Sequence, residues 1–190
     1  MTRKYDLKRR AEKQAETRRR IVQATVSLHT TEGPARTTIS AIAQRAGVER
    51  HTVYAHFPDE ASLFEACSAH WRDLHPFPDG AGWRETTDPT RRLAAALHDL
   101  YAWYERVGDD IEVLNRDAAV HELTAVLSAR REEAVAGIRK AVLSGLPRRK
   151  AVRAAVGHAF AFETWRSLVR REGLTRTQAV DAMLSFVASV

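Results

Sequence analysis

Several features that define other protein classes are scarce or missing in this 190-residue sequence. Cys67 is the only cysteine, so no internal disulfide can form, which is usual in a reducing cytoplasm. Arg or Glu interrupts every apolar run, and no segment is therefore suited to cross a bilayer. The basic start lacks the apolar stretch of a signal peptide. We expect a cytoplasmic globular protein with no membrane partner.

Motifs of catalysis are also missing. The sequence has no phosphate-binding loop, no nucleophile elbow and no HExxH zinc motif. His98, His121 and His158 are too scattered to indicate a metal site. We expect that the protein is not an enzyme and that it holds no metal or cofactor.

Alternation of apolar and polar residues, typical of strands, is absent, whereas apolar residues recur at helical spacing. This pattern predicts an all-α fold. Three of the six prolines fall within residues 75–89, which we interpret as a loop between domains. Asp59 and Thr175 have the positions of helix N-caps, and Asp88-Pro89 opens a helix. We expect helices over residues 18–31, from Asp59, from Pro89 to a break at 107–109, over 117–143, over 148–171, and from Thr175 onward.

Residues 37–57, TTISAIAQRAGVERHTVYAHF, are the most informative segment. Thr37 or Thr38 is expected to N-cap a first short helix, and Gly47 to end it in the left-handed conformation. A second helix then buries Val53 and Phe57. This layout predicts a helix-turn-helix, although an ordinary pair of packed helices has the same outline.

The outer face of the second helix carries side chains that suit the major groove of DNA. Arg50 can fork onto guanine O6 and N7, and Thr52 offers a methyl group and a hydroxyl. His51 can donate to a base or accept from one. The hydroxyl of Tyr54 can reach a phosphate. The segment therefore predicts binding to double-stranded DNA.

Positive charge is concentrated at the N-terminus. Residues 1–20 hold nine Lys and Arg against three Asp and Glu, a net +6 that equals the charge of the whole chain. Residues 59–190 hold 18 bases against 19 acids. A basic end on a near-neutral body is typical of nucleic-acid-binding modules. We expect Arg9, Arg10 and Arg18 to contact DNA, with a simple solvated tail as the alternative.

The first 71 residues carry a spaced pattern of residue types: Ile21-x-x-Ala24, Gly33, Thr37-Thr38, Ile42-Ala43, Ala46-Gly47-Val48, Thr52-Val53-Tyr54-x-His56-Phe57 and Leu63. In this pattern they resemble the DNA-binding domain of the TetR family of bacterial transcriptional regulators. The resemblance implies phosphate contacts for Thr38, Tyr54 and His56. It implies contacts to base edges for Ser40, Arg50, His51 and Thr52. Glu60 departs from the pattern, because many members carry a phosphate-binding Lys there.

These observations divide the chain into four predicted parts. They are a basic flexible arm (1–16), a helix-turn-helix domain (17–58), a connecting helix (59–74) and an effector-binding and dimerisation domain (75–190).

Apolar residues cover most of the helix expected over 148–171, which predicts burial on two sides. We infer a homodimer, with a central helix of a monomer as the alternative. The predicted interface residues are Val152, Val156, Ala159, Phe186 and Val187.

An effector site is expected between helices of the C-terminal part, with an apolar lining and a few polar anchors. Core packing is the alternative for each aromatic residue taken singly. The candidates for the lining are Leu97, Tyr101, Tyr104, Leu114, Phe160, Phe162 and Trp165, and the candidate anchors include Asp117 and His121.

The predicted function is a homodimeric repressor that leaves a palindromic operator when a small, lipophilic or aromatic effector binds. The helix from Asp59 is the predicted lever between effector and DNA. The alternatives are a nucleoid-type protein that binds nucleic acid without sequence preference, and a member of the same family that activates transcription or needs no ligand.

Overall fold

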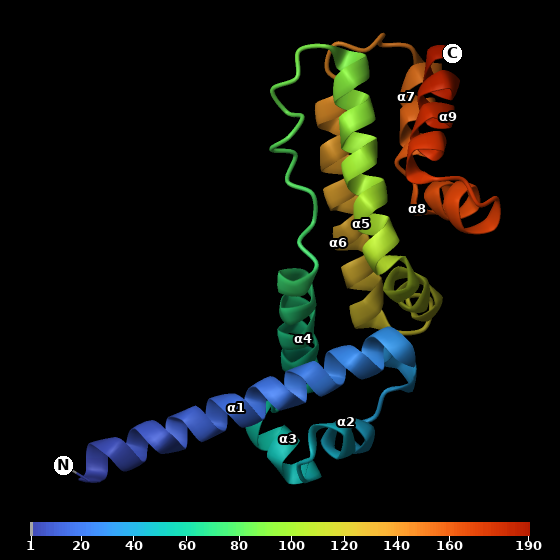
Figure 1. The fold of residues 1–190 in the computed structure, drawn as a ribbon. Coiled ribbons are helices and arrows are strands. Elements are labelled where there is room, and N and C mark those ends of the chain that lie inside the picture. Colours follow the sequence, from blue (N-terminus) through green and yellow to red (C-terminus); the bar gives the residue numbers. More distant parts are fainter. Residues whose placement is uncertain (1) are drawn as a thin grey trace. The chain divides into compact units, whose positions relative to one another are not determined.

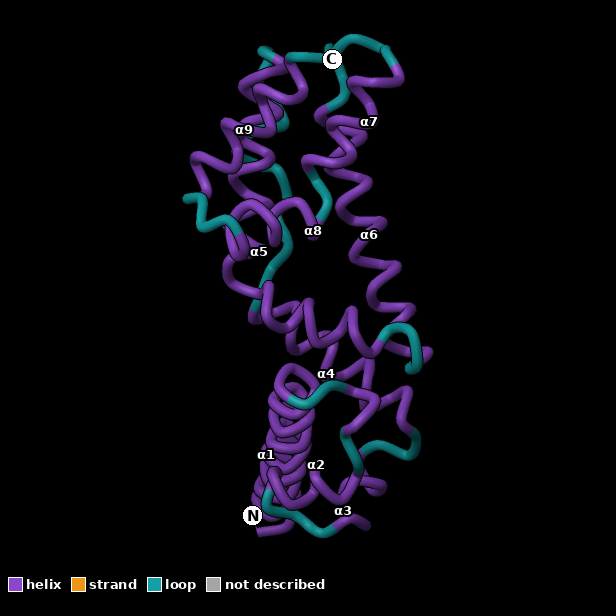
Figure 2. The backbone as a smooth tube through the Cα atoms, turned by 90° about the vertical axis from the view of Figure 1, so that its right-hand side faces the viewer, coloured by secondary structure: helices purple, strands orange, loops and turns teal. Residues whose placement is uncertain are grey.

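The computed structural model describes the backbone of residues 2–190 and the side chains of residue 5 and residues 7–190. Every regular element in this part of the chain is helical (Figures 1 and 2), which confirms the predicted all-α fold. The elements are α1 (Thr2–Thr31), the 3₁₀ turn η1 (Pro34–Arg36), α2 (Ile39–Ala46), α3 (Arg50–His56), α4 (Glu60–Leu74), α5 (Pro89–Asp117), α6 (Glu122–Val142), α7 (Lys150–Ala159), α8 (Phe162–Trp165), the π-helical segment η2 (Arg166–Arg171) and α9 (Arg176–Ala188).

The chain separates into two compact units. The first unit comprises Met1–Pro76 and Asp109–Ser128, and the second comprises Phe77–Gly108 and Ala129–Val190. Residues 109–128 thus group with the N-terminal helices and not with the C-terminal part, in which the sequence division had placed them. The helices α5 and α6 contribute to both units.

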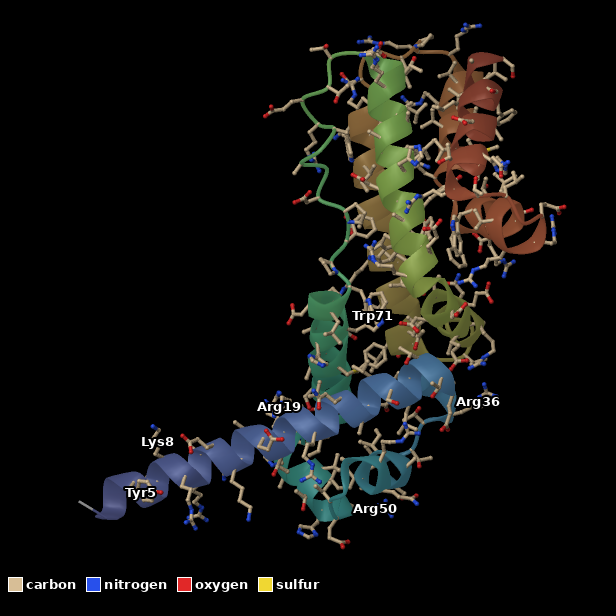
Figure 3. All side chains as sticks on the ribbon, viewed as in Figure 1. Tyr5, Lys8, Arg19, Arg36, Arg50 and Trp71 are labelled. Carbon is tan, nitrogen blue, oxygen red and sulfur yellow. The ribbon has the colours of Figure 1, made fainter. Side chains whose placement is uncertain are left out.

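Helix α1 begins at Thr2, much earlier than the start near residue 18 that the sequence suggested. The correction has a local cause: residues 2–20 contain no Gly or Pro and consist mainly of strong helix formers such as Lys, Arg, Glu, Ala and Gln. Lys8 Nζ lies 3.9 Å from Glu12 Oε1, a supporting pair at i,i+4. The residues assigned to a basic arm are therefore helical, and Tyr5 and Lys8 lie near its free end (Figure 3).

The core of the first unit joins the second half of α1 to α2, α3 and α4. Ile21 and Val53 are fully buried, and Phe57 is 3% exposed. Helix α1 packs against both α2 and α4. This core fixes the position of α3, the second helix of the predicted pair. The buried members of this core are Ile21, Val22, Ala24, Leu28, Ile42, Ala43, Ala46, Val53, Phe57, Leu63 and Cys67.

The expected N-caps are present. Asp59 Oδ1 accepts the Ser62 amide at 2.7 Å, and Thr175 forms a capping box with Gln178. Asp88 Oδ1 accepts two amides at the start of α5. The loop between α4 and α5 is also present, although Trp83 within it is almost completely buried.

The predicted helix break at residues 107–109 is wrong, because α5 passes through Gly108 without interruption. A Cβ atom on Gly108 would lie 2.6 Å from Cη2 of Trp165. The glycine therefore gives the indole ring room against the helix, and it does not end the helix. The turn follows Asp117 instead, and α6 begins at Glu122.

The single helix expected over residues 148–171 is also wrong. Helix α7 ends at Ala159, and α8 starts at Phe162. Thr164 Oγ1 donates to the His158 carbonyl at 2.7 Å, and the Ala161 amide donates to the same oxygen at 3.0 Å. A Thr hydroxyl that bonds to a nearby carbonyl competes with the regular helical ladder, which accounts for the interruption between Ala159 and Phe162.

We predict that Gly108→Ala destabilises the protein by about 1–3 kcal/mol, the usual penalty for an added methyl group in a packed core. Gly137→Ala in α6 is the matched control, because nothing lies within 4 Å of the added Cβ. This control should stabilise the helix by up to about 1 kcal/mol. Urea denaturation of both variants measures the difference. Equal stabilisation by the two substitutions would contradict the contact with Trp165.

Candidate DNA-binding site

The turn between α2 and α3 is built from local signals. Thr38 Oγ1 accepts the Ala41 amide at 3.2 Å, so Thr38 rather than Thr37 is the N-cap of α2. Gly47 ends α2 with φ of 64°, the left-handed conformation expected for it. The Val48 amide donates to the Ala43 carbonyl at 3.0 Å. These contacts set the direction in which α3 leaves the turn.

Arg20 of α1 holds this turn, a role that the sequence did not reveal. Its guanidinium donates to the carbonyl oxygens of Ala46 and Gly47, the latter at 3.0 Å. The positive charge thus satisfies carbonyl groups at the C-terminal end of α2, where a cation is favoured. Arg20 had counted only as part of the basic N-terminus, because its partners lie more than 25 residues away along the chain.

Helix α3 has one buried side and one free side. Val53 is inaccessible, whereas Arg50 and His51 are exposed and Tyr54 is 49% exposed. Figure 3 shows Arg50 on the side of α3 turned away from α1. Thr52 is half-buried, at the boundary between the buried side and the free side of α3. The structure therefore brings the predicted base-contacting residues of α3 onto one outward surface.

The remaining predicted DNA contacts lie on α1, α2 and the end of α3. Thr38 and Ser40 are at the start of α2, where Ser40 is exposed, and His56 is half-buried at the end of α3. The Arg18 guanidinium lies 4.4 Å from the centre of the Phe57 ring. This cation–π contact ties a basic side chain of α1 to the core beneath α3. Arg9 and Arg10 are exposed on the earlier turns of α1.

His121, a predicted effector anchor, has another structural role in the first unit. Its Nδ1 accepts the Thr124 amide at 3.3 Å at the start of α6, so His121 N-caps that helix. Because Nδ1 accepts this amide, we assign the proton to Nε2, which donates to Glu60 Oε1 at 3.0 Å. Glu60, which departs from the Lys that many members of the resembled family carry there, is thus bonded within the chain.

Asp117, the second predicted anchor, closes the turn after α1. Its Oδ2 accepts the Ala35 amide at 3.0 Å, and its Oδ1 accepts from Arg116 Nε at 2.7 Å. Arg116 also donates to the Glu32 carbonyl at 2.6 Å. Asp117 is 3% exposed as part of this network. Leu114, on the same stretch of α5, is half-buried.

Cys67 is a core residue of the first unit. Its Sγ lies 3.6 Å from His29 Nδ1, and burial raises the pKa of the thiol to about 12. Burial, with His121 nearby, lowers the pKa of His29 to about 4. The thiol therefore stays protonated and the imidazole neutral at neutral pH, and neither is activated as a nucleophile or base.

The other candidate effector residues form the aromatic core of the second unit. Tyr101 Oη donates to the Ala159 carbonyl at 2.8 Å, and Tyr104 Oη to the Phe160 carbonyl at 3.2 Å. Burial raises the pKa of both phenols, so they remain protonated donors. Trp165 lies 5.6 Å from Tyr104 between ring centres. Leu97, Phe160 and Phe162 are equally buried.

Two buried indoles of the second unit have an unsatisfied donor. Nε1 of Trp165 and Nε1 of Trp83 have no hydrogen-bond partner among the described residues, although both rings are almost fully buried. A buried N–H without a partner costs about 1–3 kcal/mol.

Four of the five residues predicted for a dimer interface are buried within their own unit. Val152, Val156, Ala159 and Val187 are at most 8% exposed, because α7 and α9 pack against each other there. Phe186 is 42% exposed, and its ring lies 6.0 Å from that of His158. The four buried side chains hold the unit together, and Phe186 is the member of the set that is available to a partner.

Within the described residues, no three His, Cys, Asp or Glu side chains gather closely enough to hold a metal ion. In the same part of the chain, no helix is both long and apolar enough to span a membrane.

The fold resembles that of several solved regulators. A TetR-like transcriptional regulator from Rhodococcus sp. RHA1 aligns with 18% identity and a TM-score of 0.64, covering 90% of this chain and 93% of that one. A TetR transcription regulator from Haloarcula marismortui ATCC 43049 aligns with 19% identity and a TM-score of 0.60, covering 92% and 96%. AibR, solved with isovaleryl coenzyme A and operator DNA, aligns with 22% identity and a TM-score of 0.60, covering 89% and 96%.

Comparison with curated proteins finds no match. Residues 21–67, which hold the core of the first unit and both helices of the helix-turn-helix, match the family model of the bacterial regulatory proteins, tetR family. Residues 21–67 therefore match the DNA-binding domain of the tetR family, and the fold of the whole chain resembles that of solved TetR transcriptional regulators.

Proposed function

We propose that this regulator is a homodimeric repressor, and that it leaves a palindromic operator when a small lipophilic or aromatic effector binds. The observation that carries the proposal is the outward surface of α3. Arg50, His51 and Tyr54 are exposed there, while Val53 anchors the opposite side of the helix in the core. A helix held in this way can enter the major groove with its first turn facing the bases.

Each part of the surface has a proposed task. Arg50, His51, Thr52 and Ser40 face base edges, and Thr38, Tyr54 and His56 contact phosphates. Arg9, Arg10 and Arg18 of α1 add phosphate contacts, which favour any sequence equally and make binding sensitive to salt. Helix α1 carries all three cations on one element.

A homodimer suits this mode of binding, because proteins with a helix-turn-helix usually read two half-sites related by two-fold symmetry. We propose an interface that includes Phe186 of α9. Its exposure of 42% and its neighbour His158 support this choice over the four buried interface candidates.

The proposed effector binds among the aromatic residues of the second unit. The unsatisfied Nε1 of Trp165 supports this position, since a ligand oxygen would satisfy it. Tyr101 and Tyr104 already donate to backbone carbonyls, so they line the site with their rings rather than with free hydroxyls. AibR, solved with isovaleryl coenzyme A and operator DNA, provides a precedent for an effector with an apolar acyl group.

Release requires that the effector bind one conformation better than the other. We propose that α4 carries the change to α3, and that the Glu60–His121 hydrogen bond links α4 to the start of α6. A shift of α6 at its N-cap would move the start of α4. Phe57, in the core, lies only three residues before Glu60, so α3 would follow.

Selection of bound duplexes from a random pool at near-physiological salt should enrich one palindromic site. Arg50→Ala should weaken binding to that site by about 1–3 kcal/mol and relax the preference at one position of each half-site. Tyr54→Ala should weaken binding to all DNA sequences by the same factor, because it removes a phosphate contact. Fluorescence anisotropy with the selected duplex measures both effects.

Arg72→Ala in α4 is the control for this experiment, because it removes the same charge from an exposed residue outside the surface of α3. If no DNA sequence is enriched, and the affinity simply falls as the salt concentration rises, the nucleoid-type alternative is favoured and the repressor proposal is refuted.

We predict that deleting residues 1–16 weakens operator binding and lowers the slope of log affinity against log salt by about 1 for each phosphate that is no longer bound. The core of the first unit begins at Ile21 and should remain folded. Arg9→Ala with Arg10→Ala in the full chain tests the same contacts without shortening α1. Unchanged affinity and slope in both variants would exclude the basic end from the complex.

The hydrogen bond between Glu60 and His121 predicts that operator binding can be weakened without a loss of thermal stability. His121→Asn retains an N-cap for α6 but is too short to reach Glu60, whereas His121→Ala can make neither hydrogen bond. The Asn variant should keep its thermal stability and bind the operator about two- to tenfold more weakly, because α4 is less well pre-positioned. The Ala variant should also be less stable by about 1 kcal/mol. Unchanged operator binding in both variants would leave the pair with a purely structural role.

A further inference from the structure

A basic groove lies in the second unit, between the C-terminal end of α6 and the start of α7. Two cavities of about 570 and 400 Å³ adjoin there, and both are lined by Lys140, Leu143 and Arg153. The larger is also lined by Ser144, Gly145, Leu146 and Arg148, and the smaller by Ala136 and Arg139. We call the combined site the basic groove.

The charge of this segment is exceptional for its part of the chain. Residues 139–153 contain six Lys and Arg and no Asp or Glu. The other residues from 59 onward hold 12 bases against 19 acids, so the groove is a positive site in an acidic region. The DNA-binding surface of α1, α2 and α3 does not include any of these residues.

The cations of the groove are available to bind a ligand. Arg139, Lys140, Arg148 and Arg153 are exposed, and none makes an ion pair with another described residue. No acidic side chain lines either cavity. Arg139 lies against α7, since its Nη1 would be 3.4 Å from a Cβ atom on Gly157. The positive ends therefore gather at the groove without neutralisation.

The wall of the groove is ordered by backbone contacts. The Leu146 amide donates to the Leu143 carbonyl at 3.2 Å, and Arg92 of α5 donates to the Ser144 carbonyl. Gly145 has φ of 83°, and a Cβ atom there would lie 2.9 Å from Pro89. This turn holds Leu143 and Leu146 beside the cations, so the groove offers an apolar patch next to its positive charge.

We propose that the basic groove binds a nucleotide-sized organic polyphosphate. Guanidinium groups bind phosphate oxygens in pairs, and Lys adds a compact positive charge. Leu143 and Leu146 would contact the apolar ring of such a ligand. A volume of about 570 Å³ suits a small molecule, as most ligand sites span about 300–1,000 Å³. The proposal stands independently of the repressor mechanism.

Isothermal titration of the full-length protein with ATP and with inorganic pyrophosphate, at about 0.15 M salt, tests the site. We expect ATP to bind more tightly than pyrophosphate, because only ATP has a ring for the leucines. Lys140→Glu with Arg153→Glu should weaken ATP binding by at least about tenfold, since repulsion replaces charge-assisted hydrogen bonds. Arg148→Ala should weaken it less.

Arg166→Glu with Arg171→Glu is the matched control, with the same change of charge on exposed residues of η2 that line neither cavity. Thermal unfolding verifies that each variant is folded. Equal weakening by the control pair, or no binding of ATP by the wild type, would overturn the site. Equal affinity for ATP and pyrophosphate would overturn the nucleotide assignment. A last outcome concerns a DNA duplex that lacks the operator sequence. If the wild type binds this duplex but gives no heat with ATP, and the groove variant no longer binds the duplex, these cations bind DNA and the proposal is refuted.

Discussion

The burial of Val53 and Phe57 beneath α3 is the constraint on which the DNA-binding surface depends. Both side chains pack into the core that α1, α2 and α4 supply, and this leaves only one way for the short helix to face. A helix of seven residues has little stability of its own, so tertiary packing must hold it. The exposed positions of Arg50, His51 and Tyr54 follow from these two buried anchors.

Charged and polar side chains divide into those that build the fold and those that remain exposed. Arg20 binds carbonyls at the end of α2, Asp117 closes the turn after α1, and His121 joins the N-cap of α6 to Glu60. Arg50 stays exposed on α3. All are polar residues in a basic, helical sequence, and only their partners distinguish the structural ones from those available to DNA.

The second unit uses aromatic residues in two ways. The hydroxyls of Tyr101 and Tyr104 satisfy carbonyls near the break between α7 and α8, where the helical ladder is interrupted. Trp165 packs on the bare surface of α5 at Gly108 and keeps an unsatisfied N–H. The same cluster thus stabilises an irregular backbone and leaves one buried indole N–H without a hydrogen-bond partner among the described residues.

The sequence by itself determined the helical class, the turn at Gly47 and the outward side of α3, because each depends on spacing within a few residues. It left the N-cap of α2 open between Thr37 and Thr38. Our interpretation of the sequence misplaced the start of α1, although residues 2–20 are mainly helix formers. It also misplaced a break at Gly108, since local propensity cannot show whether a glycine ends a helix or admits an indole ring. Only the tertiary structure decided that Glu60 meets His121 and that the valines of α7 are buried within their own unit. Those outcomes depend on contacts between residues far apart in the chain, and periodicity carries no record of such partners.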